Sequence, residues 1–158
     1  MSPQAVDLSV NPADETIRIG PLELRFLVTA ENSGGAIAVF ELAVPAGQRL
    51  MAPAHSHDHF EETFYGIAGV LTWTIDGKPI AVGPGQALCI PRGAVHRFDN
   101  HGTEDVKGLC LASPAAIGPQ FFREAAALAS TAKSGPPDRA KVEEIMRRHG
   151  LTPAPPPS

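Results

Sequence analysis

The chain has 158 residues, of which 43% are hydrophobic and 19% are charged, and its formal net charge is −4. This length and composition predict one globular domain with its own core, and they exclude a wholly disordered chain. The mild acidic excess argues against nucleic acid or a membrane surface as the main partner. No apolar run reaches transmembrane length and no signal peptide is evident at the N-terminus, so we expect a cytoplasmic protein.

Four parts follow one another along the chain, and no internal repeat is evident. Residues 1–15 are polar and irregular, and residues 16–113 contain successive short β-prone runs. Residues 114–151 change to a helical period, and the Pro-rich residues 152–158 are predicted to be disordered.

The β-prone part is typical of an antiparallel barrel or sandwich. Residues 22–29 and 37–44 are two such runs, and residues 31–35 between them form a turn rich in glycine. Residues 71–75 alternate apolar and hydroxyl side chains, as a half-buried strand does. Asp76-Gly77 follows directly and is a favoured two-residue hairpin turn.

The helical part contains signals for two helices. Pro119 suits the first turn of a helix that runs through residues 121–128. Asp138 is the expected N-cap of a second helix, which stops at Gly150. We predict that both helices pack on the outside of the barrel. The alternative is that they cover a barrel mouth or a dimer partner.

The two cysteines, Cys89 and Cys110, both lie in apolar strand-like segments. We interpret them as small buried hydrophobic residues rather than as a disulfide or a reactive thiol.

Four residues are candidates for a metal site: His55, His57, Glu62 and His96. Three imidazoles and a carboxylate are a suitable ligand set for a divalent transition metal. His55 and His57 are two positions apart, so on a strand they project from the same face. Glu62 stands at an odd offset from His57, so the chain must bend between them, and His96 comes from a later strand. Their convergence requires a closed barrel.

Such a site would leave a divalent ion with a net charge of about +1 and with open coordination positions. Iron, manganese, nickel, zinc, cobalt and copper accept these ligands, so the identity of the ion stays open. His59 and Glu61 lie in the same stretch and are expected to face solvent. His101 and His149 are interpreted as surface residues.

Two segments of the chain resemble the paired motifs of the cupin superfamily. The first family motif is His-x-His, four residues, Glu, six residues and Gly, and it is matched by His55, His57, Glu62 and Gly69. The second is Gly, five residues, Pro-x-Gly, two residues, His, three residues and Asn, and it is matched by Gly85, Pro91, Gly93, His96 and Asn100. The flanking strand pattern extends the likeness to residues 16–113.

The resemblance implies a mainly β fold, a double-stranded β-helix or jelly-roll barrel, here with short C-terminal helices. It implies one divalent metal ion near the barrel centre, held by His55, His57, Glu62 and His96. It also implies a small-molecule substrate or ligand, and a homodimer, since small cupins are often homodimers.

One departure from many family members is Gly66, which is small where they have larger residues. If the strand after Glu62 is regular, Gly66 shares a face with Glu62 and Phe64. Our hypothesis is that Gly66 leaves space for a substrate near the metal. The alternative is a β-bulge or close strand packing.

The first functional interpretation is a metal-dependent dioxygenase that acts on a small oxygenated organic compound. It looks similar to small quercetinase-like cupins, partly because of the helical C-terminus with Phe121 and Phe122. In this scheme the metal would chelate an enol or enolate and orient oxygen beside it. Glu62 is also the candidate catalytic residue, because it would become a base if it left the metal.

Two alternatives stay open. One is a non-redox isomerase, decarboxylase or lyase with the metal as Lewis acid, and the other is a ligand-binding cupin without turnover. An inward-facing Arg92 or Arg97 would favour an anionic substrate, whereas both are otherwise expected to face solvent. Four apolar residues either shape the cavity or form ordinary core: Phe64, Trp73, Ile90 and Phe98.

Overall fold

The computed structural model describes residue 10 and residues 15–156 of the chain. Most of the segment predicted to be irregular, residues 1–15, therefore lies outside the described residues. The strands are β1 (Thr16–Ile19), β2 (Leu22–Val28), β3 (Ala38–Val44), β4 (His55–His57), β5 (Glu61–Ala68), β6 (Leu71–Ile75), β7 (Lys78–Val82), β8 (Ala87–Ile90), β9 (His96–Asp99), β10 (Val106–Ser113) and β11 (Leu151–Pro153). The helices are α1 (Ala30–Ser33), α2 (Pro119–Thr131) and α3 (Arg139–Arg148).

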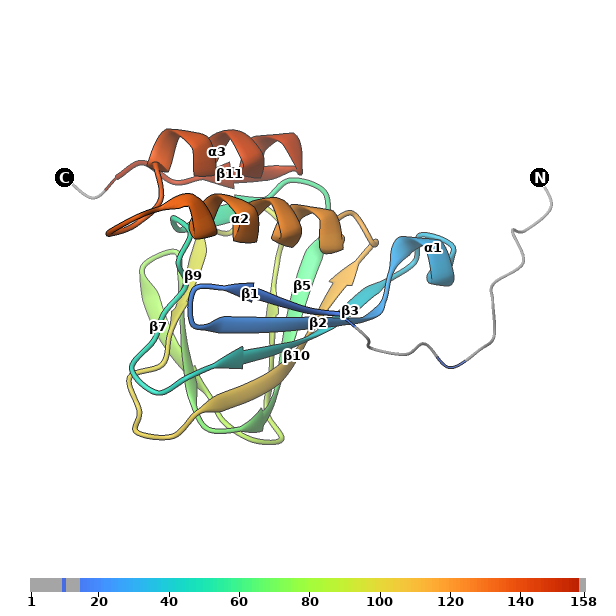
Figure 1. Ribbon diagram of the computed structural model, residues 1–158. Coiled ribbons are helices and arrows are strands. Elements are labelled where there is room, and N and C mark those ends of the chain that lie inside the picture. Colours follow the sequence, from blue (N-terminus) through green and yellow to red (C-terminus); the bar gives the residue numbers. More distant parts are fainter. Residues whose placement is uncertain (1–9, 11–14, 157–158) are drawn as a thin grey trace.

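Two antiparallel sheets face each other and enclose the core (Figure 1). The six-stranded sheet has the order β1-β2-β3-β10-β5-β8, and the five-stranded sheet has the order β11-β4-β9-β6-β7. The predicted mainly β jelly-roll barrel is therefore confirmed.

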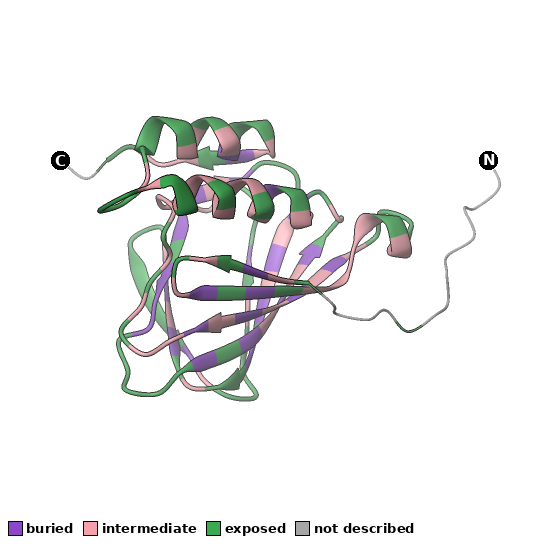
Figure 2. Ribbon diagram, viewed as in Figure 1, coloured by how far each residue is buried: buried purple, intermediate pink, exposed green. Residues whose placement is uncertain are grey.

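Side-chain alternation explains why these segments pair as strands. β3 and β10 alternate buried with less buried residues along their length, and the buried positions face the barrel interior (Figure 2). The predicted hairpin between β6 and β7 is also confirmed. Asp76 and Gly77 have φ angles of 46° and 81°, as the favoured two-residue turn requires.

Helices α2 and α3 lie together over one end of the barrel (Figure 1). Phe122 of α2 packs on Phe26 and Phe40, with ring centroids 5.6 Å and 5.3 Å apart. The prediction that the helices pack on the outside of the barrel is therefore wrong for α2, and the alternative of a covered mouth is the arrangement observed. The predicted N-cap is present, because the backbone N–H of Ala140 donates to the Asp138 carboxylate at 2.9 Å.

The C-terminal segment is a strand where disorder was predicted. Thr152 and Pro153 belong to β11, which pairs with β4 and forms the edge of its sheet. The Thr152 hydroxyl donates to the Asp58 carboxylate at 2.7 Å, and the N–H of Ala154 donates to the Ala54 carbonyl at 2.7 Å. Proline is tolerated in an edge strand, and the free edge of β4 supplies hydrogen bonds that composition cannot reveal. Residues 157–158 lie outside the described part.

Truncation after Gly150 should lower the free energy of unfolding by about 3 kcal/mol or more, because it removes the buried Leu151 and the strand that pairs with β4. Truncation after Ala154 keeps β11 and is the matched control. Urea unfolding of both proteins measures the difference. Equal midpoints for the two truncations would contradict the structural role of β11.

Gly66 does not open space toward the candidate metal site, so the hypothesis of a substrate pocket at this residue is wrong. Its N–H donates to the Gln86 carbonyl at 2.9 Å, and its carbonyl accepts from the Gly85 N–H at 2.9 Å. A Cβ atom at Gly66 would lie 2.2 Å from the carbonyl oxygen of Gly83. The alternative, close packing of backbone against backbone, is what requires glycine here.

Gly66→Ala should therefore destabilise the barrel by about 3 kcal/mol, since the contact that it violates is with backbone and not with a flexible side chain. Gly83→Ala is the control on the other side of this contact, because its Cβ would meet only side-chain atoms, the Gln86 oxygen at 3.4 Å and Val70 Cγ2 at 3.8 Å. Thermal unfolding compares the two variants. A Gly66→Ala protein as stable as Gly83→Ala would refute the explanation.

Candidate metal centre

Three histidines converge inside the barrel. His55 and His57 lie on the same buried face of β4, and His96 begins β9, where it pairs with His55. Each of the three offers one ring nitrogen, and these nitrogens lie within 4.8 Å of one another. The alternation of β4 and the closure of the barrel thus bring together the three histidines that the sequence predicts.

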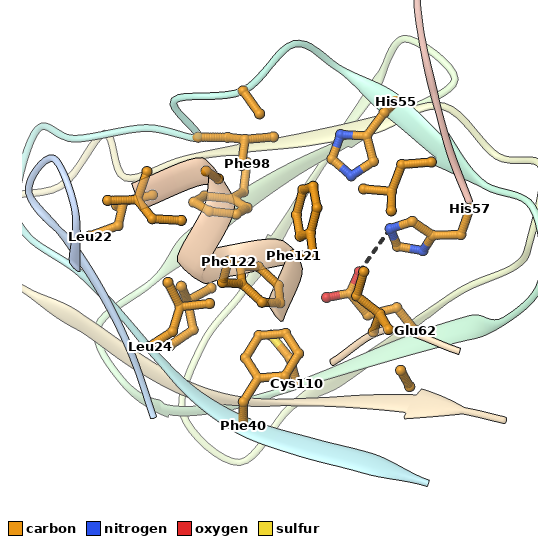
Figure 3. A pocket seen from close by; sticks show the side chains of 18 of the residues that line it. Leu22, Leu24, Phe40, His55, His57, Glu62, Phe98, Cys110, Phe121 and Phe122 are labelled. Atoms are coloured by element: carbon orange, nitrogen blue, oxygen red, sulfur yellow. Dashed lines mark ion pairs between the residues drawn. The ribbon is translucent and has the colours of Figure 1, made fainter. Parts of the chain in front are cut away.

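Glu62 reaches the same space from β5 (Figure 3). Its Oε2 lies 3.5 Å from Nε2 of His57 and 3.7 Å from Nε2 of His96. The bend that its odd offset demands is present between β4 and β5. Phe60 within that bend is buried and stacks on the ring of His57, with centroids 4.2 Å apart.

Backbone carbonyls fix the orientation of two imidazoles. Nδ1 of His55 lies 2.9 Å from the carbonyl of Pro53, and Nδ1 of His96 lies 2.9 Å from the carbonyl of Ala94. A carbonyl can only accept, so each Nδ1 must carry the hydrogen and each Nε2 keeps a free lone pair. This tautomer is the one that a metal ligand needs, with an orienting partner on the other nitrogen.

His57 is held differently. Its Nε2 is the atom near Glu62, while its Nδ1 is buried and has no hydrogen-bond partner among the described residues. Stacking on Phe60 rather than a hydrogen bond therefore sets the orientation of this ring.

Burial keeps the imidazoles neutral. It lowers the pKa of His55 to about 4 and that of His57 to about 2, with a further contribution from the neighbouring imidazoles. Burial also lowers the pKa of His96. Neutral imidazoles need not release a proton to bind a metal, so the three nitrogens are ready to act as ligands at neutral pH.

Burial has the opposite effect on the carboxyl group of Glu62 and raises its pKa to about 7. A hydrogen bond with Cys110 lowers this pKa, but by less than burial raises it. A cation at the centre would favour the charged carboxylate. Three neutral imidazoles and one carboxylate in an apolar interior form a set that could hold a divalent transition metal.

A cavity of about 110 Å³ extends from these residues toward the mouth covered by α2 (Figure 3). Apart from the histidines and Glu62, its walls are almost wholly apolar, and no lysine or arginine lines it among the described residues. The lining includes Leu22, Leu24, Phe40, Trp73, Phe98, Cys110, Phe121 and Phe122. Phe64 and Ile90, which the sequence also offered as cavity residues, are buried in the core and do not line the cavity.

The cysteines differ from the prediction in one case. Cys110 is buried, as predicted, but it also lines the cavity and hydrogen-bonds Glu62, a contact that no local pattern in the sequence indicates. Cys89 is exposed, so the prediction that it is a buried hydrophobic residue is wrong. Cys89 lies on β8, an edge strand of the six-stranded sheet, and is exposed although its neighbours in the sequence are apolar.

The remaining charged candidates lie at the surface. Arg92 pairs with Glu61 through two hydrogen bonds of 2.6 Å and 2.8 Å, and Arg97 pairs with Asp99 at 2.9 Å. Both arginine side chains are 48% exposed, so neither adds a positive charge to the cavity. His59 and His101, which were predicted to face solvent, are exposed. His149 contacts Glu124 of α2.

Comparison with known proteins gives the family. The family model of the cupin domain matches residues 40–112. Over 118 residues the chain is 31% identical to the polyketide synthase CurC of Streptomyces cyaneus, which covers 72% of this chain and 75% of that protein. The chain belongs to the cupin family.

Two further likenesses are more restricted. The cupin is 34% identical over 84 residues to quercetin 2,3-dioxygenase of Bacillus subtilis, which is 52% of this chain but only 24% of that protein. Its fold matches the polyketide cyclase RemF of Streptomyces resistomycificus with a TM-score of 0.52 and 25% identity, over 59% of this chain and 65% of that one. This cupin thus spans about a quarter of the first relative and about two thirds of the second.

None of the helices in the described part of the cupin is long and apolar enough to cross a membrane.

His57→Ala should lower the metal content of the purified cupin roughly tenfold or more, because it removes a nitrogen from the centre. Glu62→Gln, which keeps the shape of the side chain but removes its charge, should weaken metal binding as well. His59→Ala and His101→Ala are the controls, since both residues are exposed. Elemental analysis of protein prepared without added metal measures the result. Unchanged metal in His57→Ala would rule out this centre.

Proposed function

We propose that this cupin is a metal-dependent dioxygenase that acts on a small, apolar, oxygenated compound. The observation that carries the proposal is the position of the candidate centre. Three histidines and Glu62 form the polar end of a cavity whose other walls are apolar. Such a cavity suits a substrate that has its oxygen atoms at one end only.

The residues that line the cavity limit the charge that a substrate can carry. No arginine or lysine lines the cavity among the residues that the structure describes, so a phosphate or dicarboxylate would lose its hydration without gaining an ion pair. An enol or enolate with a neighbouring carbonyl carries at most one negative charge. It offers two oxygens to a divalent ion, which can act as a Lewis acid and template when bound.

Residues of the chain would bind the ion, exclude water from the cavity and accept the substrate proton. His55, His57 and His96 would hold the ion, and Phe98, Phe121 and other apolar walls would exclude water and orient the substrate. Glu62 would be the fourth ligand and, once displaced by the substrate, the base that accepts the enol proton.

Trp73 offers a further polar contact. It lines the cavity, and its buried indole N–H has no hydrogen-bond partner among the described residues. Buried donors are rarely left unpaired, so we propose a substrate oxygen as the acceptor.

A non-redox reaction on a related substrate is the second candidate. It is favoured by the likeness to a polyketide synthase, CurC, over three quarters of that protein's length, and by the likeness to the polyketide cyclase RemF. The likeness to quercetin 2,3-dioxygenase favours the first candidate over a shorter part of the relative. The same centre serves both, because both need an enolisable ketone held at a cation.

Oxygen consumption separates the two candidates. With a single-ring 1,3-diketone such as benzoylacetone, the metal-loaded cupin should take up oxygen in step with loss of the diketone. Glu62→Gln should react about a hundredfold more slowly or worse, since it cannot accept the proton. An oxygen electrode and absorbance of the enol give the two rates. Product formed equally well without oxygen would replace the dioxygenase with the non-redox candidate.

The cytoplasmic location and the homodimer stay predictions.

A further inference from the structure

A second apolar space adjoins the cavity. It has a volume of about 40 Å³ and lies where α2, α3 and the Met51 segment meet. Its lining consists of Ile19, Met51, Ala52, Phe121, Ala125, Leu128, Ala129, Pro137, Val142 and Ile145. Five of these residues also line the main cavity: Ile19, Met51, Ala52, Phe121 and Ala125. The two spaces are therefore neighbours with a shared wall, and the second leads away from the candidate metal centre toward the helices.

Small side chains lie along the passage between the two spaces. Phe121, Ala125 and Ala129 are spaced four apart on α2 and so follow one face of the helix. Alanine at the second and third of these positions places little side-chain volume next to the phenylalanine, and both alanines line the second space. Ala52 stands on the wall shared by both spaces.

The sizes of the two spaces limit what fits. A cavity of about 150 Å³ holds a molecule the size of benzene. The main cavity, at about 110 Å³, thus accommodates one small ring at most, and the second space, at about 40 Å³, accommodates a narrow chain but no ring. Met51, which lines both spaces, is 40% exposed although it is apolar and flexible, so a chain that passed beside it would cover exposed apolar surface.

We propose that the substrate has a compact oxygenated head of about one ring and a linear apolar tail, and that the tail passes Ala52 and Ala125 into the space between α2 and α3. This inference rests on the proposed function, which places the head at the metal. It adds that linear tails are accepted and that fused ring systems are excluded.

A series of 2-alkyl-3-hydroxy-4-pyranones with tails from methyl to octyl tests the inference on the zinc-loaded full chain. The head chelates metal, and only the tail length varies. Burial of each methylene should lower Kd by roughly fourfold over the first several carbons. Isothermal titration calorimetry gives Kd for each compound.

Ala125→Phe should block the passage. It should remove the gain with longer tails, and because Ala125 also lines the main cavity, the methyl compound is measured in the same variant as the baseline for its series. Ala129 lines only the second space, so Ala129→Phe should keep the gain in affinity for short tails and stop it once the tail reaches residue 129. Ala127→Phe, on the exposed side of the same helix, is the matched control and should behave like the unmodified chain.

The outcomes separate the inference from the proposed function. If the methyl compound binds in a metal-dependent way but tail length has no effect, the head site stands and the tail passage is overturned. A gain that persists in Ala125→Phe also overturns it. If no member of the series binds the metal-loaded protein, both the proposed function and the inference fail.

Discussion

Four polar side chains share one small buried space inside the barrel, and the fold must hold them there despite the cost of burying them. They are His55, His57, Glu62 and His96. Backbone carbonyls take the Nδ1 hydrogens of His55 and His96, so the opposite nitrogens face inward with free lone pairs. Glu62 adds a carboxyl group within 3.7 Å of two histidines. Lone pairs and carboxylate oxygens that face one another in an apolar interior repel unless a proton or a cation lies between them. A divalent metal ion bound among the four side chains would remove this repulsion.

The strand that carries two of these residues is short and depends on the end of the chain. β4 has three residues and pairs with β9 through His55 and His96 alone, whereas its other edge pairs with all three residues of β11. Leu151 of β11 lines the cavity as well. The C-terminal segment therefore both supports the strand that carries His55 and His57 and lines the cavity, so the candidate site depends on an intact β11.

Local patterns account for what the sequence predicted correctly. The two-residue offset of His55 and His57 and the Asp76-Gly77 turn depend on alternation and backbone conformation within a few residues, so they can be interpreted without the fold. The family motifs extended this to His96. Three features were either predicted wrongly or given only as alternatives, because they depend on partners distant in the chain. The packing at Gly66 is set by Gly83, and the strand β11 is set by the free edge of β4. The covering of the barrel mouth by α2 is set by aromatic residues of β2 and β3.

Charge balance in the cavity connects the candidate centre to its substrate. Three neutral imidazoles and the carboxylate of Glu62 leave a divalent ion with a net charge of about +1. A substrate with one negative charge would make the buried complex neutral, whereas a dianion would leave an uncompensated negative charge in an apolar cavity, at a cost of several kcal/mol. Arg92 and Arg97 do not offset such a charge, because each is half-exposed outside the cavity and already paired with a carboxylate. Under the proposed function, the barrel with Glu62 ionised would favour a substrate that binds as a monoanion over a dicarboxylate by electrostatics alone, before any shape selection by the walls.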